Sequence, residues 1–107
     1  MKNYLLTAKA EADLRSIIQY TRTERGDTQA RRYIEKLEQG IATLIDGKHG
    51  SKDMGDLYPK LRMKKCEHHY VFCLQRDNDR SLIIAIFHER LDLMKRLSNR
   101  LGNDSYP

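Results

Sequence analysis

Two long segments in the first half of the chain carry apolar residues at helical spacing. The apolar face of the first segment, residues 7–24, consists of Ala10, Leu14, Ile17, Ile18 and Thr21. The second segment begins near residue 27, and its apolar positions are Ala30, Tyr33, Ile34, Leu37, Ile41, Leu44 and Ile45. Both sets follow the i, i+3, i+4, i+7 pattern of an amphipathic helix. Because only a short break separates the segments, the sequence predicts an antiparallel helical hairpin.

Individual residues mark where these helices begin, end and approach a neighbour. The Thr7 hydroxyl can cap the first helix, and Gly26 interrupts the pattern between the two. Gly47 is placed to end the second helix. Gly40 lies inside the second helix, where glycine costs about 1 kcal/mol relative to alanine. It therefore predicts a close approach of the neighbouring helix.

Short apolar or alternating segments predict strands on both sides of the hairpin. They comprise residues 3–6, 61–66, 69–75 and 82–88. Residues 48–60 and 77–80 predict loops, and residues 91–101 predict a last helix that Gly102 ends. Three successive strands are expected to pair antiparallel. The chain, residues 1–107, is therefore predicted to be one α+β domain: an N-terminal strand and an antiparallel helical hairpin packed on a small antiparallel sheet, with a C-terminal helix.

The central strand is apolar on both of its faces. Tyr70, Phe72 and Leu74 alternate with Val71 and Cys73. The helical hairpin can cover only one face of the sheet. The other face needs the last helix, a second copy of the chain or a partner protein to exclude water. This pattern predicts a protein partner.

Charged residues make up 33% of the 107-residue chain, and the formal net charge is +5. Lysines and arginines are interleaved with acidic residues, so the charge permits a polyanionic partner without requiring one. The N-terminus lacks the apolar run of a signal peptide, and no stretch approaches the roughly 18 apolar residues of a membrane span. We therefore expect a cytoplasmic protein that spans no membrane.

The two cysteines, Cys66 and Cys73, fall in predicted strands and resemble small core residues. If residues 67–68 form a two-residue turn, Arg62 faces Cys73 and His69 faces Cys66. The two sulfur atoms then lie too far apart along the hairpin for a disulfide. This arrangement favours a reducing compartment.

His88 is the residue with the clearest potential for proton transfer. It closes an apolar run, residues 82–87, and is followed by two charged residues. As a general acid or base it would work with cations such as Arg62 and Lys64, which neutralise a phosphate. The alternative is a histidine that hydrogen-bonds at the strand end and shapes the following turn. We favour this alternative because the sequence offers no obvious second catalytic partner.

No metal or cofactor site is predicted. His68 and His69 are adjacent strand residues and point to opposite faces, so they cannot easily share an ion. Zinc-type ligand spacings, glycine-rich phosphate loops and nucleophile elbows cannot be placed in the sequence.

Two groups of basic residues are candidates for contacts with a partner. The first contains Arg62, Lys64 and Lys65, and the second contains Arg90, Lys95, Arg96 and Arg100. Arg31 and Arg32 on the second predicted helix are instead expected to form a solvated face, paired with Glu35 at helical spacing.

Short motifs occur in a specific order along nearly the whole chain. They are Ala12-Asp13-Leu14 with Ile17 and Tyr20, then Gly26, Gln29-Ala30 and Tyr33, then His69-Tyr70-Val71-Phe72, and finally Ile86-Phe87-His88-Glu89-Arg90-Leu91-Asp92. In this order, the set resembles the RelE/ParE superfamily of bacterial type II toxin–antitoxin systems, and its ParE branch in particular. Arg25, where the family often has Trp, and Leu91, where it often has Met, depart from the pattern. We interpret both as packing variants.

The resemblance implies a toxin whose target depends on the branch. The RelE branch cleaves messenger RNA in the ribosome, with basic residues and commonly a Tyr or His near the C-terminus. The ParE branch looks like the same scaffold without that set, and it poisons DNA gyrase and so blocks replication. Tyr70 stands where nucleases tend to carry Arg, and after Asp92 no Tyr or His occurs until Tyr106. The resemblance therefore implies a gyrase inhibitor rather than an enzyme, held by a ParD-like antitoxin in a hetero-oligomer.

For a gyrase inhibitor, the expected partner-binding residues are Arg62, Lys64, Arg90, Lys95 and Arg96, with no catalytic residue. Nucleic acid would then be contacted directly only within the gyrase–DNA complex. The alternative is a messenger-RNA endonuclease on the same scaffold, in which Arg62 and Lys64 neutralise phosphate and His88 moves protons. A third alternative is a non-toxic binding module, although scattered charge and the lack of a recognition helix argue against operator binding.

Overall fold

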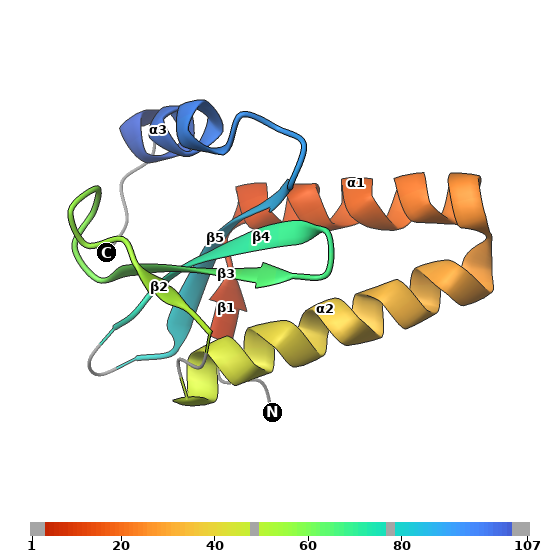
Figure 1. Cartoon of the computed structure of the whole chain (residues 1–107), viewed down its shortest axis with the longest axis horizontal. Coiled ribbons are helices and arrows are strands. Elements are labelled where there is room, and N and C mark those ends of the chain that lie inside the picture. The colour runs from red at the N-terminus through yellow and green to blue at the C-terminus, as the bar shows by residue number, and fades with distance from the viewer. Residues whose placement is uncertain (1–3, 48–49, 77–78, 104–107) are drawn as a thin grey trace.

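A two-helix hairpin packs against one face of a five-stranded sheet, and a short C-terminal helix lies over the other face (Figure 1). The computed structural model describes residues 4–47, 50–76 and 79–103. The elements are β1 (Tyr4–Leu6), α1 (Ala8–Arg25), α2 (Asp27–Gly47), β2 (Lys52–Asp53), β3 (Leu61–Cys66), β4 (His69–Leu74), β5 (Ser81–His88) and α3 (Leu93–Asn103). This order confirms the predicted α+β fold.

The hairpin begins and turns where the sequence predicts. Thr7 Oγ1 accepts a hydrogen bond from the Ala10 backbone N–H at 3.1 Å and caps α1. Gly26 ends α1 with a φ of 87°, a conformation that favours glycine, and its N–H donates to the Arg22 carbonyl. Helix α2 begins at the next residue, Asp27, so the two helices are antiparallel neighbours.

Gly40 allows a close approach, but strand β3 makes that approach rather than the neighbouring helix. A Cβ atom placed on Gly40 would lie 2.5 Å from Cys66 Sγ, at the end of β3. Because glycine has no Cβ, α2 can lie close to the sheet at this point. The predicted close approach at Gly40 is therefore present, but the prediction that a helix makes it is wrong.

Both cysteines lie in the sheet in the predicted register. Arg62 pairs with Cys73, and Cys66 pairs with His69, across β3 and β4. The two thiols are buried and free. Burial raises the pKa of both thiols, that of Cys73 to about 11. Neither thiol is therefore a reactive thiolate near neutral pH.

The sheet is mixed, with the strand order β1-β5-β4-β3-β2. The predicted antiparallel pairing is confirmed for β3, β4 and β5. Strand β1, however, pairs parallel with β5, so the sheet is not purely antiparallel. The two strands lie at opposite ends of the sequence, and the long connection between them allows a parallel pairing that a short turn cannot close.

The loop predicted for residues 48–60 contains a short strand. Strand β2 pairs antiparallel with Arg62 and Met63 of β3, at the edge of the sheet. Two residues are too few to produce a recognisable alternation in sequence. Residues 48–49 and 77–78 of the predicted loops, and Tyr106, lie outside the described residues.

Helix α3 starts two residues later than its apolar pattern predicts. The carboxylate of Asp92 accepts a hydrogen bond from the Lys95 N–H at 3.2 Å and caps the helix. Leu91 belongs to the preceding turn, where its N–H donates to the His88 carbonyl at 3.0 Å. The helix also continues one residue beyond Gly102. Among the described helices, none is long and apolar enough to cross a membrane.

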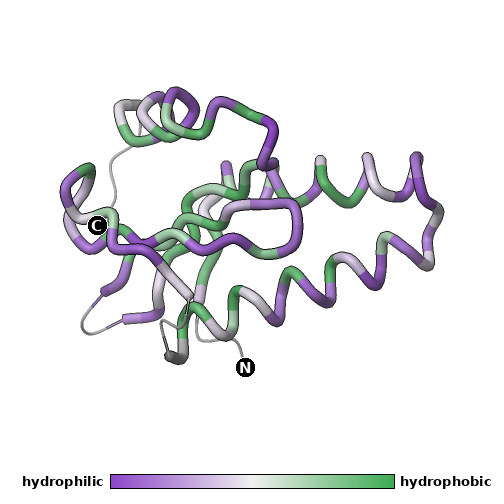
Figure 2. Tube along the Cα trace, viewed as in Figure 1, coloured by the Kyte–Doolittle hydropathy of each residue, from purple (hydrophilic) through white to green (hydrophobic). Residues whose placement is uncertain are grey.

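Each face of the sheet carries its own apolar core. On the hairpin side, Val71 and Cys73 of β4 pack in one cluster with Leu37 of α2. On the other side, Phe72 of β4 packs in a second cluster with Leu97 of α3. Figure 2 shows hydrophobic positions along the strands and alternating hydrophobic and hydrophilic turns along α2 and α3. The division of β4 between two faces confirms the sequence pattern.

The sheet face opposite the hairpin is closed within the chain. Phe72, Ile84 and Leu97 are each 0% exposed. Of the three covers considered from the sequence, the last helix is the one used, assisted by Met54 and Tyr58 from the segment before β3. Within the described residues, neither face of the sheet is left uncovered. The argument that an uncovered sheet face requires a protein partner is therefore wrong.

A β-bulge in β5 shapes this second core. Phe72 pairs with Ala85 and Cys73 pairs with Ile83, which leaves Ile84 as an extra residue. Ile84 and Ala85 are sequence neighbours, yet both belong to the core under α3. The bulge thus adds apolar surface where the single helix packs.

Candidate functional site

Polar side chains gather where β5 ends and β3 turns into β4. This strand-end cluster consists of Tyr33, Lys65, His68, His69, His88 and Glu89. Its members come from α2, from β3 and β4 on both sides of their turn, and from the end of β5. The cluster therefore joins α2 to two loops that are far apart in sequence.

Tyr33 and His69 form the less exposed part of the cluster. The Tyr33 hydroxyl lies 2.6 Å from His69 Nδ1 and accepts a hydrogen bond from the His68 backbone N–H at 3.0 Å. The tautomer of His69 determines which of the two groups donates in the Tyr33–His69 bond. Burial is the main cause that lowers the pKa of His69 to about 4, so this histidine is neutral at pH 7. Burial also raises the pKa of Tyr33.

His88 ends β5, and it is half-buried. Its ring meets the ring of His69 edge to face, with centroids 5.0 Å apart. Its Nδ1 accepts a hydrogen bond from the Arg90 backbone N–H at 3.1 Å. Only Nε2 is then left to contact another molecule. This geometry suits a histidine that shapes the strand end better than a general acid or base.

Glu89 is the charged centre of the exposed half of the cluster. Its carboxylate lies 3.0 Å from Lys65 Nζ and 2.7 Å from His68 Nδ1. Hydrogen bonds from Lys65 and then His68 lower the pKa of Glu89 to about 2. The Glu89 backbone N–H also donates to the His68 carbonyl at 2.9 Å. The residue ties the end of β5 to the β3–β4 turn, and so acidic a carboxyl group is a poor general base.

Arg62 and Lys64 are not gathered beside His88. Arg62 Nε donates to Ser51 Oγ at 2.9 Å, and its guanidinium lies 3.8 Å from Asp53. It therefore holds the segment before β3. Lys64 lies on β3, two strands away from His88 and displaced along the sheet. Strand spacings place the backbones of Lys64 and His88 roughly 12 Å apart.

Arg90, Lys95 and Arg96 lie in the short segment that leads into and begins α3. We call these three exposed residues the C-terminal patch. In the part of the chain that the structure describes, their side chains form no ion pair. The guanidinium and ammonium groups are therefore exposed and unpaired among the described residues, and their role in binding a partner stays a prediction.

Arg100 was grouped with these cations by sequence, but its side chain points into the molecule. Its guanidinium donates to both Asp13 oxygens, at 3.0 and 3.1 Å, and to the Ile84 carbonyl at 2.7 Å. Asp13 also accepts the Ile86 backbone N–H at 3.0 Å. The guanidinium lies 5.0 Å from the centre of the Phe87 ring. We call the Asp13–Arg100 pair the α3 latch.

The latch covers the part of β5 that β1 leaves without a neighbouring strand. Strand β1 pairs only with Ser81, Leu82 and Ile83. The backbone groups of Ile84 and Ile86 beyond it are satisfied by the latch instead. Sequence reasoning missed this arrangement because its partners are 87 residues apart. The only sign of it in the sequence is Asp13, an acidic residue beside the apolar face of α1.

The expected pairing of Arg31 and Arg32 with Glu35 is not formed. Within residues 4–47, 50–76 and 79–103, neither arginine makes an ion pair. An exposed pair at helical spacing gains little over solvation, so the side chains remain in water. Both charges are therefore unneutralised on the outer surface of α2.

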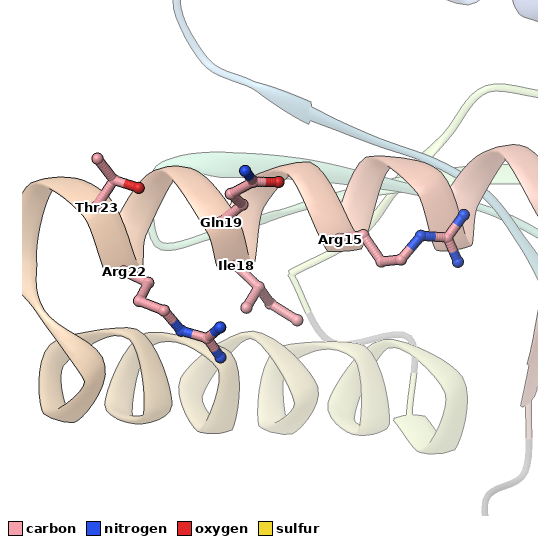
Figure 3. Close-up of a pocket in the computed structure, with 5 residues that line it drawn as sticks. All are labelled: Arg15, Ile18, Gln19, Arg22 and Thr23. Carbon is pink, nitrogen blue, oxygen red and sulfur yellow. The ribbon is translucent and has the colours of Figure 1, made fainter.

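Helix α1 carries a shallow hollow of about 440 Å³ (Figure 3). It is lined by Arg15, Ile18, Gln19, Arg22 and Thr23. Ile18 lies between the two arginines along the helix. The described residues contain no group of three or more His, Cys, Asp or Glu side chains that could hold a metal ion.

Similarity to known proteins places this chain among the toxins of type II toxin–antitoxin systems. Residues 4–93 match the family described as ParE toxin of type II toxin-antitoxin system, parDE, and the chain belongs to this family. It is 62% identical over 101 residues to Toxin ParE of Escherichia coli, which covers 94% of this chain and 98% of that protein. The resemblance to the ParE branch is confirmed.

A solved structure shares the fold. It is described as the chromosomal ParDE TA system from P. aeruginosa, and it aligns with a TM-score of 0.64. The match covers 79% of this chain and 92% of that chain at 17% identity. At this identity the likeness establishes the fold alone.

Proposed function

We propose that this toxin poisons DNA gyrase, blocks replication and is neutralised by a ParD-like antitoxin. Its membership of the ParE family supports the proposal, and the ParDE description of the related structure is consistent with an antitoxin partner. It would act as a protein poison rather than an enzyme, in the cytoplasm and without a cofactor. Contact with nucleic acid would occur only within the gyrase–DNA complex.

One observation favours this function over messenger-RNA cleavage. The three nuclease candidates are dispersed, since Arg62 is engaged by Ser51 and the backbones of Lys64 and His88 are roughly 12 Å apart across the sheet. A nuclease needs its proton donor and its phosphate-binding cations around one scissile bond. Arg62 is also an unsuitable partner contact, because only 19% of its side chain is exposed.

The test is a supercoiling assay with purified gyrase, ATP and relaxed plasmid, scored for linear DNA after protein digestion. A gyrase poison should produce linear DNA in proportion to added toxin. Unchanged supercoiling without linear product at micromolar excess would contradict the proposal. Cleavage of messenger RNA that His88→Ala abolishes would then support the nuclease alternative. Under gyrase poisoning, His88→Ala should act only through a weakened strand end.

The C-terminal patch is the proposed contact for a partner. Reversing the charges of Lys95 and Arg96 together should weaken binding to one of the two partners, gyrase or antitoxin, more than to the other. Both side chains are exposed, so the reversal should leave the melting temperature nearly unchanged. Unaltered affinity for both partners would exclude the patch.

A further inference from the structure

The turn end of the α1–α2 hairpin extends beyond the sheet (Figure 1). Between Ile17 on α1 and Ala30 on α2, no residue is buried. Eight residues of α1 follow Ile17, which corresponds to roughly 12 Å of helix. We call residues 18–32 the hairpin tip. The tip contributes almost nothing to either core, so its length and composition are not explained by the fold.

The composition of the tip is typical of a binding surface. Tyr20 is 68% exposed, more than any other large hydrophobic residue of the described chain. The tip contains four arginines but only two acidic residues. Of these arginines, only Arg22 forms an ion pair with a described residue, Asp27, at 3.0 Å. Arg25, Arg31 and Arg32 make no ion pair with described residues. Tyrosine and arginine are the residues that most often dominate binding energy at interfaces.

The hollow on α1 continues this surface along its flank. In Figure 3, Ile18 lies between Arg15 and Arg22, whose guanidinium groups extend on the same side of the helix. The ion pair of Arg15 with Glu11 spans 3.9 Å between exposed side chains, so it neutralises the guanidinium only weakly. Arg22 is already paired with Asp27, so the apolar floor beside Arg15 is the part that suits a partner residue with a carboxylate on a short aliphatic stem.

We propose that the hairpin tip docks into an acidic concave surface of DNA gyrase. This inference rests on the proposed function, and it identifies the surface of the toxin that contacts gyrase. The tip is a narrow convex projection, which fits a concavity in a large partner. The C-terminal patch belongs to the segment that leads into α3, the helix over the other face of the sheet (Figure 1), and is then left for the antitoxin.

A protein surface fits the tip better than DNA does. Glu24 and Asp27 lie at its very end, between the arginines, where they would repel a phosphate backbone. The exposed ring of Tyr20 and the aliphatic Ile18 add apolar contact that a protein concavity can exclude from water. Mixed charge with one aromatic anchor therefore indicates a predominantly acidic protein surface.

The test compares two variants with the same change of charge. Arg31→Glu/Arg32→Glu alters the tip, and Lys52→Glu/Arg80→Glu alters exposed cations on β2 and before β5. Acidic residues near the start of α2 are favourable for the helix dipole, so the tip variant should remain folded. Thermal unfolding checks both variants, and Tyr20→Ala provides an independent change in the tip. Each protein is titrated into gyrase, ATP and relaxed plasmid, and linear DNA is scored.

We expect the tip variant and Tyr20→Ala each to need roughly tenfold more protein for half-maximal linear DNA. The control variant should match the unaltered toxin. If the unaltered toxin poisons gyrase and both tip variants do so at the same concentration, the docking inference is overturned and the proposed function stands. If the unaltered toxin yields no linear DNA, the proposed function fails and the inference falls with it. Plasmid binding without gyrase that the tip variant loses would show that the tip binds DNA, which also overturns the inference.

Discussion

The two faces of the sheet are covered in different ways. On one face, α1 and α2 contribute 18 and 21 residues and pack along a continuous apolar core. On the other face, α3 contributes 11 residues, and the latch fixes its C-terminal half through Arg100. The hairpin is therefore held mainly by buried area, whereas α3 depends on a few apolar side chains and one ion pair. This difference predicts that α3 is the less stable part of the fold.

The largest expected effect comes from two matched substitutions, one in the core on each face of the sheet. Leu37 on α2 and Leu97 on α3 are both 0% exposed and both face the sheet. Leu37→Ala should lower the free energy of unfolding by about 3 kcal/mol, as is typical of a buried leucine. Leu97→Ala should cost less in global stability, because α3 can detach before the remainder unfolds.

Urea unfolding and amide hydrogen exchange measure this difference. In Leu97→Ala, the amides of α3 should lose protection while those of β4 keep it. In Leu37→Ala, protection should fall throughout the molecule. Equal losses with identical exchange patterns would mean that the two faces unfold as one unit, and the proposed difference would be wrong.

The latch should have the next largest effect. Arg100→Ala leaves the Asp13 carboxylate without its partner and the Ile84 carbonyl without its donor. The side chains of Arg100 and Asp13 are only 14% and 18% exposed, so we expect a loss of about 2 to 3 kcal/mol. The exposed pair of Arg22 and Asp27 serves as a control, since Arg22→Ala should cost less than about 1 kcal/mol.

A double-mutant cycle tests whether the latch acts as a pair. Asp13→Ala and Arg100→Ala should each be strongly destabilising, and the double variant should lose far less than the sum. Additive losses in chemical denaturation would show that the two residues act independently. The latch would then not account for the attachment of α3.

The contrast between the faces also explains which features the sequence revealed. The hairpin and the β3–β4 register follow from spacing within short segments, so Ala30 to Ile45 and the pairing of Cys66 with His69 were predictable. The parallel pairing of β1, the contact of Gly40 with Cys66 and the latch join residues far apart in sequence. Local patterns contain no information about such distant partners.

In the candidate site, too, local features were predictable from the sequence and contacts between distant residues were not. His88 was placed correctly at the end of its strand because an apolar run stops there. Its contact with His69 and the hydrogen bond of Tyr33 depend on how α2 lies on the sheet. Arg100 was misplaced among the exposed cations, since its partner Asp13 belongs to another helix. Charge alone therefore does not distinguish a cation that binds a partner from one that holds the fold.

Lowering the pH from 7 to 5 should lower the free energy of unfolding through His69, which packs against α2. His69 has a pKa of about 4 in the folded protein, and an unfolded histidine has one of about 6.5. Between these values the unfolded state binds the extra proton, so stability falls as the pH falls. From pH 7 to pH 5 the loss should be about 2 kcal/mol. The pKa of Glu89 is lowered to about 2, so the stability that it contributes is lost only below about pH 4.5, outside this window.

Urea unfolding of the unaltered protein and of His69→Gln at pH 7 and pH 5 measures this dependence. His69→Gln should be less stable at pH 7, because the bond with Tyr33 is altered, but it should lose little further stability at pH 5. His88 and His68 face the same ring and are present in both proteins. If His69→Gln lost as much free energy of unfolding between pH 7 and pH 5 as the unaltered protein, the pH dependence would come from another group.

The smallest expected effect tests how closely α2 approaches the sheet at Gly40. Gly40→Ala gains about 1 kcal/mol of helix propensity, but its Cβ would lie 2.5 Å from Cys66 Sγ. Overpacking against a strand costs about 1 to 3 kcal/mol, so the net change should be a loss of about 1 kcal/mol. In a Cys66→Ala background the obstructing sulfur is gone, but the Cβ of residue 66 would still lie 3.0 Å from the new Cβ, so the same substitution should cost less than it does beside Cys66. Thermal melts of the four proteins measure the difference, because a contact with helix α1 instead would make Gly40→Ala equally destabilising in both backgrounds.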